Sequence, residues 1–406
     1  MKNESTKFLG YERPDSSVGV RNYVAIISGG NCANELAATI SNQVKGTVPL
    51  LPDYVCVRFK EDNERALRTM IGLGNNPNVA AAVVVGIGCE HIGMNALGEG
   101  IMKSKKPVEI ATVLGNNGYE EALEKGLTAA RRMVSEVSQM QRKPFDLSHL
   151  IVGLKCGASN ATSGIVGNPV TGLVTDRIIS AGGTAIFSET TEIIGGTHLL
   201  AKRAINKEVA RRLEEAVDRM EARIKATGED VRGSQPTPAN IEGGLTTLEE
   251  KSLGVIEKTG KSRLQDVLEN AECPRGKGLY FMDGSANTSE LVVAEAAAGI
   301  QIHIMNVGGG ISSSFRGCLV GWSGALQTLP VVTVVSNRSR PQDRKEEEFF
   351  DIFADSIIEG KESITQVADR LFQEIIAVAS GKLTKSEKHI PSFQMPLELY
   401  HTGPIL

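Results

Sequence analysis

Four of the six cysteines follow apolar runs that have the length of β-strands. These residues are Cys32, Cys56, Cys89 and Cys156. Because ligands collect at the carboxyl ends of strands in open parallel sheets, the four thiols could meet there and hold iron, as a single ferrous ion or as an iron–sulfur cluster. Burial is the alternative for each thiol, because free cysteine is often buried and no CxxC spacing is present.

Carboxylates and imidazoles follow two of the predicted strands. Glu90 and His91 follow the first of these strands, and Glu192 and His198 follow the second. Both side-chain types transfer protons in enzymes, so these four residues are the candidate catalytic acids and bases. A structural role is the alternative for Glu90, because a glutamate is favourable in the first turn of a helix.

A polar, glycine-containing loop is predicted at residues 155–164. The hydroxyl groups of Ser159, Thr162 and Ser163, together with backbone N–H groups, could bind a carboxylate there. The same side chains could instead cap the helix that follows.

Two cations are candidates for binding the carboxylate of a small acidic substrate. A capping-box pattern explains Thr246 and Glu249 but leaves the nearby Lys251 without a role. Lys251 and Arg21 are therefore the candidate carboxylate-binding residues.

The elements that must position these residues alternate between strands and helices. Continuous apolar runs such as residues 80–85 indicate strands that helices cover on both faces. Strands are predicted at residues 23–28, 79–86, 107–113, 150–154, 184–187, 278–282, 300–307 and 331–336. Helices are predicted at residues 34–44, 119–140, 170–181, 206–227 and 364–379. This pattern predicts an α/β fold with two Rossmann-like units, whose mostly parallel sheets are flanked by helices.

A polar stretch at residues 141–146 marks the expected domain boundary. It divides the chain into a first α/β domain, residues 1–145, and a second α/β domain, residues 146–406. Residues 228–245 are rich in Gly, Pro and charged residues and are predicted to form a long loop in the second domain.

Composition excludes several classes of partner. The net charge of the 406 residues is −4 and no continuous basic stripe is present, so no nucleic acid is expected. No apolar run approaches the roughly 20 residues that span a bilayer, and the first residues are polar, so a cytoplasmic protein without a membrane partner is expected. The glycines at residues 308–310 lack the GxGxxG spacing of a dinucleotide site.

An ordered set of segments resembles the altronate/galactarate dehydratase family between residues 8 and 337. The segments are residues 8–15, 18–22, 86–90, 156–159, 163–164, 168–169, 182–184, 189–192 and 243–254. The resemblance implies a metal-dependent lyase, with Fe2+ as the usual metal, that eliminates water from a hydroxy or sugar acid such as altronate or galactarate to give a 2-keto-3-deoxy acid. It also implies a separately encoded small subunit, because the family motifs begin at residue 8. A homo-oligomer is compatible with this reading.

Two other functions are compatible with the same resemblance. Sulfolactate sulfo-lyases, which release sulfite, belong to the same broad group. A non-catalytic binding subunit is the other alternative, because two family features are missing. Residues 52–56 keep a tyrosine and a thiol but lack the family's histidine, and residues 307–310 lack an arginine that Arg316 could replace.

Overall fold

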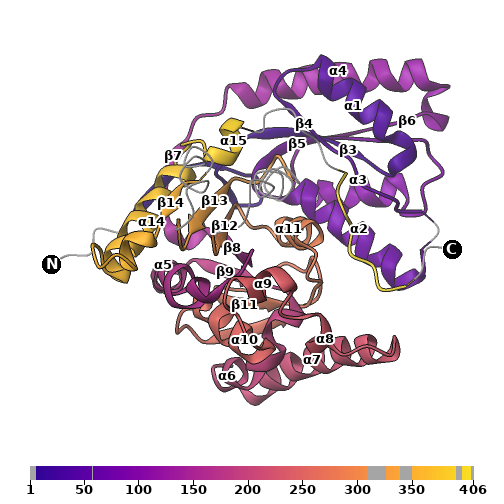
Figure 1. Cartoon of the computed structure of the whole chain (residues 1–406). Helices are drawn as coiled ribbons and strands as arrows, with labels where there is room; N and C mark the ends of the chain where they lie inside the picture. Colours follow the sequence, from indigo (N-terminus) through magenta and orange to yellow (C-terminus); the bar gives the residue numbers. More distant parts are fainter. Residues whose placement is uncertain (1–5, 57, 310–325, 339–349, 390–395, 404–406) are drawn as a thin grey trace.

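The computed structural model describes residues 6–56, 58–309, 326–338, 350–389 and 396–403. Within these residues the chain forms three β-sheets, and two of them are entirely parallel. Helices cover both faces of the parallel sheets (Figure 1). The predicted α/β fold with parallel sheets flanked by helices is confirmed. Arg316 lies outside the described residues.

The first part of the chain builds a four-stranded parallel sheet. Its strand order is β4 (Thr47–Leu50), β3 (Tyr23–Ser28), β5 (Val79–Gly86) and β6 (Val108–Thr112). Every residue of β5 is buried, because alternate side chains face helices on opposite sides of the sheet. One side is covered by α1 (Asn34–Gln43) and α4 (Tyr119–Ser138), and the other by α2 (Lys60–Asn75) and α3 (Met94–Met102).

The second part of the chain builds a seven-stranded parallel sheet. Its strand order is β10 (Leu264–Leu268), β11 (Gly278–Met282), β9 (Thr184–Phe187), β8 (Ile151–Gly157), β12 (Ile302–Val307), β13 (Val331–Val335) and β14 (Ile352–Phe353). One face packs against α5 (Asn168–Ser180), α7 (Lys207–Ala226) and α14 (Ile364–Ala379). The other face packs against α11 (Thr288–Ala297), which lies between the two parallel sheets (Figure 1).

Two regions that were predicted without secondary structure contain ordered elements. The polar stretch at residues 141–146 includes β7 (Lys143–Asp146), which pairs with β1 (Lys7–Glu12) beside β2 (Val18–Gly19) in a small antiparallel sheet. The sequence analysis missed β7 for two reasons: its residues are polar, and its pairing partner lies more than a hundred residues away in the sequence.

Two short helices interrupt the predicted long loop at residues 228–245. They are α8 (Val231–Ser234) and α9 (Pro238–Glu242), and side chains at their N-termini, Asp230 and Thr237, cap them. The next helix, α10 (Leu248–Ile256), begins one residue later than the predicted capping box implies: Thr247 is its N-cap. The remaining described α-helices are α6 (Thr197–Lys202) and α15 (Lys385–His389).

Among the described residues, every helix is too short or too polar to span a lipid bilayer.

The contact between α2 and α11 joins the two parallel sheets, and it predicts an unusual response to a glycine substitution. Replacing a helical glycine by alanine normally stabilises a helix by roughly 0.5–1 kcal/mol. At Gly72 we expect the opposite, because a Cβ atom there would lie 2.3 Å from the carbonyl oxygen of Ala297. Gly72→Ala should lower the free energy of unfolding by about 1–3 kcal/mol, measured by urea denaturation.

Gly233→Ala is the matched control, because a Cβ atom at this helical position has open space around it. Equal effects of the two substitutions would contradict the tight packing at Gly72.

Candidate active site

The strand order of the seven-stranded sheet reverses between β8 and β12. In open α/β sheets, ligands bind outside the carboxyl ends of the strands at such a point. Here the loops after β8 and β12 are in contact: Asn160 donates from Nδ2 to the carbonyl oxygen of Gly309 at 3.1 Å. A Cβ atom on Gly308 would lie 2.5 Å from the carbonyl oxygen of Ala158, so glycine is required for this close approach.

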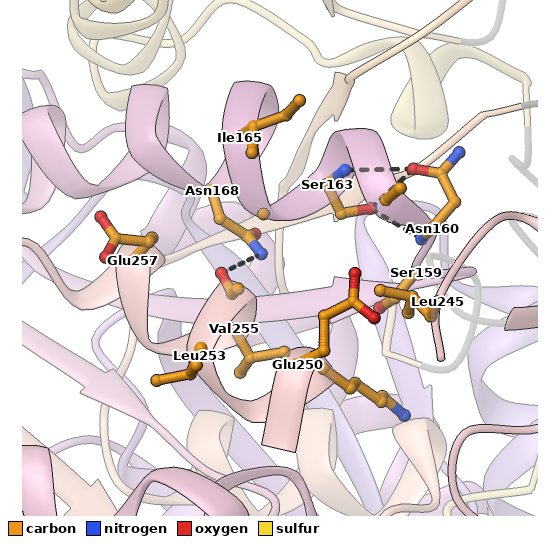
Figure 2. A pocket seen from close by; sticks show the side chains of 14 residues that line it. Ser159, Asn160, Ser163, Ile165, Asn168, Leu245, Glu250, Leu253, Val255 and Glu257 are labelled. Atoms are coloured by element: carbon orange, nitrogen blue, oxygen red, sulfur yellow. Dashed lines mark hydrogen bonds between the residues drawn. The ribbon is translucent and has the colours of Figure 1, made fainter. Parts of the chain in front are cut away.

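A pocket of about 320 Å³ opens at this end of the sheet (Figure 2). The loop after β8, the start of α5 and helix α10 line it, and its volume is in the range of small-molecule sites. Its polar and charged side chains are Ser159, Asn160, Ser163, Asn168, Glu250, Lys251 and Glu257. The loop and α10 approach closely because Gly164 meets Gly254, where an added Cβ atom would lie 2.8 Å from the Cα atom opposite.

Lys251 and Asn168 are two buried polar side chains of the pocket wall. Lys251 is 8% exposed, and its Nζ donates to Oε1 of Gln235 at 2.7 Å. Asn168 is 1% exposed, and its Nδ2 donates to the carbonyl oxygen of Gly254 at 2.8 Å, as Figure 2 shows. The Oδ1 atom of Asn168 is buried and has no hydrogen-bond partner among the described residues. A buried acceptor of this kind is costly unless a ligand or water donates to it.

A buried cluster of four charged residues lies at the ends of β8 and β9. Lys155 at the end of β8 contacts the carboxylate of Glu189, and its Nζ lies 3.7 Å from Oε1 of Glu192. Nζ of Lys258 donates to Oε2 of Glu192 at 2.8 Å. Each of the four side chains is at most 5% exposed. Burying four charges is tolerable only because positive and negative groups alternate.

Electrostatics set the protonation of this cluster. Burial raises the pKa of Glu192, but the neighbouring cations Lys155, Lys258 and Lys251 lower it by a larger amount. The net result is a pKa of about 2. Burial lowers the pKa of Lys155, and the neighbouring cations Lys258 and Lys251 add to this, against the opposite effect of Glu192. Glu192 is therefore ionised at neutral pH, and Lys155 loses its proton more readily than an ordinary lysine. The effect of Lys251 on both groups links the cluster electrostatically to the pocket.

Glu189 is held in a strained backbone conformation. Its φ is 76°, in the left-handed region that non-glycine residues rarely adopt, at a cost of roughly 1–3 kcal/mol. The following residue fixes the turn: Thr190 donates from its backbone N–H to the carbonyl oxygen of Gly284 at 3.1 Å and from Oγ1 to Oδ1 of Asp283 at 2.6 Å. The loops after β9 and β11 therefore hold Glu189 against Lys155.

Three of the predicted substrate-binding residues line the pocket, and two do not. Ser159, Ser163 and Lys251 are in its wall. Thr162 is outside the wall, and its hydroxyl donates to Oδ1 of Asn160 at 2.7 Å.

Arg21 has a structural role. Its guanidinium forms a two-point ion pair with Glu387 and donates to the carbonyl oxygens of Val20, Val378 and Lys382. These contacts use all five of its N–H groups, so none is left for a substrate carboxylate. Arg21 anchors the C-terminal helices instead.

The four candidate acids and bases lie in different surroundings. Both carboxylate oxygens of Glu90 accept hydrogen bonds from the backbone N–H groups of residues 87 and 88, so Glu90 supports its own loop. His91 and His198 are exposed and do not line the pocket. Glu192 is in the buried cluster, but its low pKa leaves it without a proton to donate at neutral pH, so the expected acid role does not fit.

The four cysteines do not form the expected iron site. Cys32 and Cys89 are exposed, Cys56 is partly buried, and only Cys156 is fully buried. Its Sγ lies 3.0 Å from Oγ of Ser159. In the parts of the chain that the structure describes, no three His, Cys, Asp or Glu side chains are grouped as a metal ion would require. These residues therefore do not fit a bound iron, and no catalytic step is assigned to a metal.

Lys155, Lys258, Glu189 and Asn168 were not predicted as site residues. A signal existed for Lys155 and Glu189, because each is a charged residue at the end of an apolar strand. No pattern marks Lys258, which enters the cluster from a short helix that follows α10.

The low pKa of Glu192 predicts a loss of stability in acid. A carboxyl group whose pKa is lowered on folding contributes stability that is fully present above its ordinary pKa near 4.5 and is lost as the pH falls towards 2. For Glu192 this loss amounts to about 2 kcal/mol at pH 3. Urea unfolding at pH 7 and pH 3 should therefore show a larger loss for the natural chain than for Glu192→Gln. The variant should also be about 3–5 kcal/mol less stable at pH 7, because it leaves the buried Lys258 without its carboxylate partner. Identical acid losses would contradict the low pKa.

Comparison with known proteins shows the family of this chain. Residues 10–138 match the family model "D-galactarate dehydratase/Altronate hydrolase, second domain", and residues 147–401 match "D-galactarate/Altronate dehydratase, C-terminal". The (2R)-sulfolactate sulfo-lyase subunit beta of Chromohalobacter salexigens is 36% identical, over 95% of this chain and 96% of its own length. Galactarate dehydratase (L-threo-forming) of Escherichia coli is 32% identical, over 93% of this chain and 74% of its own length. Altronate dehydratase of Bacillus subtilis is 28% identical, over 95% of this chain and 76% of its own length. The chain belongs to the D-galactarate/altronate dehydratase family, as the resemblance in its sequence implies.

Proposed function

We propose that this chain is a lyase that eliminates water from a small hydroxylated carboxylic acid and produces a 2-keto-3-deoxy acid. Two observations carry the proposal: a pocket with a buried cation, Lys251, and a buried lysine of lowered pKa, Lys155, which lies outside the pocket wall and whose pKa Lys251 helps to lower. A cation and a base are the two groups that this elimination requires. The names of the dehydratase relatives support the same reaction class.

In this proposal Lys251 binds the substrate carboxylate and Lys155 is the base. Lys155, in its neutral form, takes the proton from the carbon next to the carboxylate, and Lys251 stabilises the negative charge that develops on the carboxylate oxygens. The carbon–oxygen bond at the neighbouring carbon then breaks, and the departing hydroxide takes the proton that the ammonium group of Lys155 now holds and leaves as water, which returns Lys155 to its neutral form. The resulting enol becomes the 2-keto acid. Glu189 and Glu192 position Lys155 through their ion pairs.

Release of sulfite is a second candidate function. It is favoured by the match to the sulfo-lyase subunit beta, which extends over 96% of that relative, whereas the dehydratases are matched over only 74% and 76% of their lengths. The word "subunit" in that name also supports our proposal that a separate small chain completes the active enzyme. We place the enzyme in the cytoplasm, where its cysteines stay reduced, and cell fractionation tests this.

A requirement for Fe2+ remains part of the proposal, and metal analysis tests how it would be bound. Because the described cysteines do not form a metal site, replacing Cys89 and Cys156 together by serine should leave the iron content of anaerobically purified protein unchanged. Loss of iron from this double variant would support the four-thiol site that the sequence predicted. Absence of iron from the natural chain would contradict the proposed metal requirement.

The role of Lys155 predicts the effect of a conservative substitution. Lys155→Arg keeps the positive charge but cannot accept a proton at neutral pH, so kcat should fall by about 10²–10⁴-fold. Lys106→Arg is the matched control and should keep the activity of the natural chain. Lys106 is also buried, and burial lowers its pKa to about 7. Its Nζ, however, donates to the carbonyl oxygens of Asn75 and Asn76 at the C-terminal end of α2, and Lys106 does not line the pocket.

Both variants are compared at equal folded fraction, by circular dichroism, and each is assayed alone and with the small partner chain. The assay measures 2-keto-3-deoxy acid and sulfite separately, so that the two leaving groups are distinguished. Unchanged kcat in Lys155→Arg would show that another group is the base. A natural chain that releases neither product, with or without the partner, would be a non-catalytic binding subunit.

A further inference from the structure

We propose that the pocket selects an acid with one carboxylate and several hydroxyl groups, and that it rejects acids with a second anionic group. This inference rests on the proposed function, because it concerns the substrate of the same pocket. It separates altronate, which has one carboxylate, from galactarate, which has two, and from sulfolactate, which carries a carboxylate and a sulfonate. Relatives of the chain are named for all three acids.

The distribution of charge around the pocket carries the first part of the argument. In the buried cluster, Lys155 contacts Glu189 and Lys258 pairs with Glu192, so the cluster offers no unpaired cation to a ligand. Lys251 is the one cation in the described pocket wall, and Glu250 and Glu257 are in the same wall. One carboxylate can therefore pair with Lys251. A second anionic group would have only the two glutamates as charged neighbours and would be repelled.

The second observation behind the inference is that the buried Oδ1 atom of Asn168 has no hydrogen-bond partner among the described residues. The orientation of this amide is fixed, because its Nδ2 donates both to the carbonyl oxygen of Gly254 and, at 3.7 Å, to Sγ of Cys156. Its Oδ1 atom, buried and without a described partner, can only accept a hydrogen bond. This atom has almost no accessible surface in the structure, so a substrate hydroxyl can donate to it only when the pocket wall moves aside, whereas an ionised carboxylate or sulfonate has no proton to donate. The pocket therefore favours a hydroxyl group at this position.

The other polar groups of the wall leave little room for a second anion. Oγ of Ser163 accepts from the backbone N–H of Asn160 and lies 3.3 Å from Oδ1 of the same residue. Oγ of Ser159 is engaged with Sγ of Cys156 at 3.0 Å. A carboxylate or sulfonate at this end of the pocket would have to displace these contacts, whereas a hydroxyl group can both donate and accept within them.

Binding of three acids tests the selection. Altronate, galactarate and (2R)-sulfolactate are titrated by calorimetry into the full-length chain. Altronate should bind at least about tenfold more tightly than either dianion, because the dianions lose a hydrogen bond or meet a like charge in the wall. The double variant Glu250→Gln, Glu257→Gln should bind all three acids more tightly, and the two dianions by the larger factor, so the preference for altronate should fall several-fold. Glutamine keeps an oxygen that can accept the hydrogen bonds that Thr246 donates to Glu250.

Glu249→Gln is the matched control, because Glu249 is the neighbouring glutamate on α10 but does not line the pocket. It should leave all three affinities unchanged. Tighter binding of galactarate or sulfolactate than of altronate by the natural chain would overturn the inference, and so would a preference that the double variant does not reduce. In both cases the proposed lyase function would survive. If none of the three acids binds, the proposed function itself fails, and the inference fails with it.

Discussion

The site depends on the ion pairs that Lys155 makes with Glu189 and Glu192 in the interior of the protein. Four buried charges at the ends of two adjacent strands are stable only while each has its partner, so the cluster fixes the geometry of both strand ends. The strained backbone of Glu189 shows how strongly the surrounding loops define this arrangement. Glu192, which holds the lysine in place, raises the pKa of Lys155, but burial and the neighbouring cations Lys258 and Lys251 lower it by more, so the lysine can lose its proton and act as a base.

The parallel sheet brings these groups next to the pocket. The loop after β8 carries Ser159 and Asn160 at the point where the strand order reverses, and α10 brings Lys251 from nearly a hundred residues further along the chain. The glycines at positions 164 and 254 let these two segments approach within van der Waals contact. The apolar strands have few reactive side chains, but their order in the sheet determines which polar residues lie close together.

Much of the fold could be predicted from the sequence, but the pairing of distant side chains could not. Continuous apolar runs identified strands such as β5 and β9, because strands covered on both faces have no polar positions. The strand β7 was missed, since its residues are polar and its partner β1 is remote in the sequence. In the site, hydroxyl groups and Lys251 were found from the composition of their segments. Arg21 was misplaced because a sequence does not show that Glu387 already binds it. The thiols were expected to meet because each follows a strand, but strands of two different sheets carry them.

The central claim is that an acid substrate binds at the ends of β8 and β12, with its carboxylate on Lys251 and its reacting carbon facing Lys155. A crystal structure of the full-length chain with altronate bound tests this claim most directly. The account predicts density for the acid in the pocket between the loop after β8 and helix α10, with a hydroxyl group within hydrogen-bond distance of Oδ1 of Asn168. An acid bound instead at the edge of the four-stranded sheet, near Cys32 and Cys89, would contradict it.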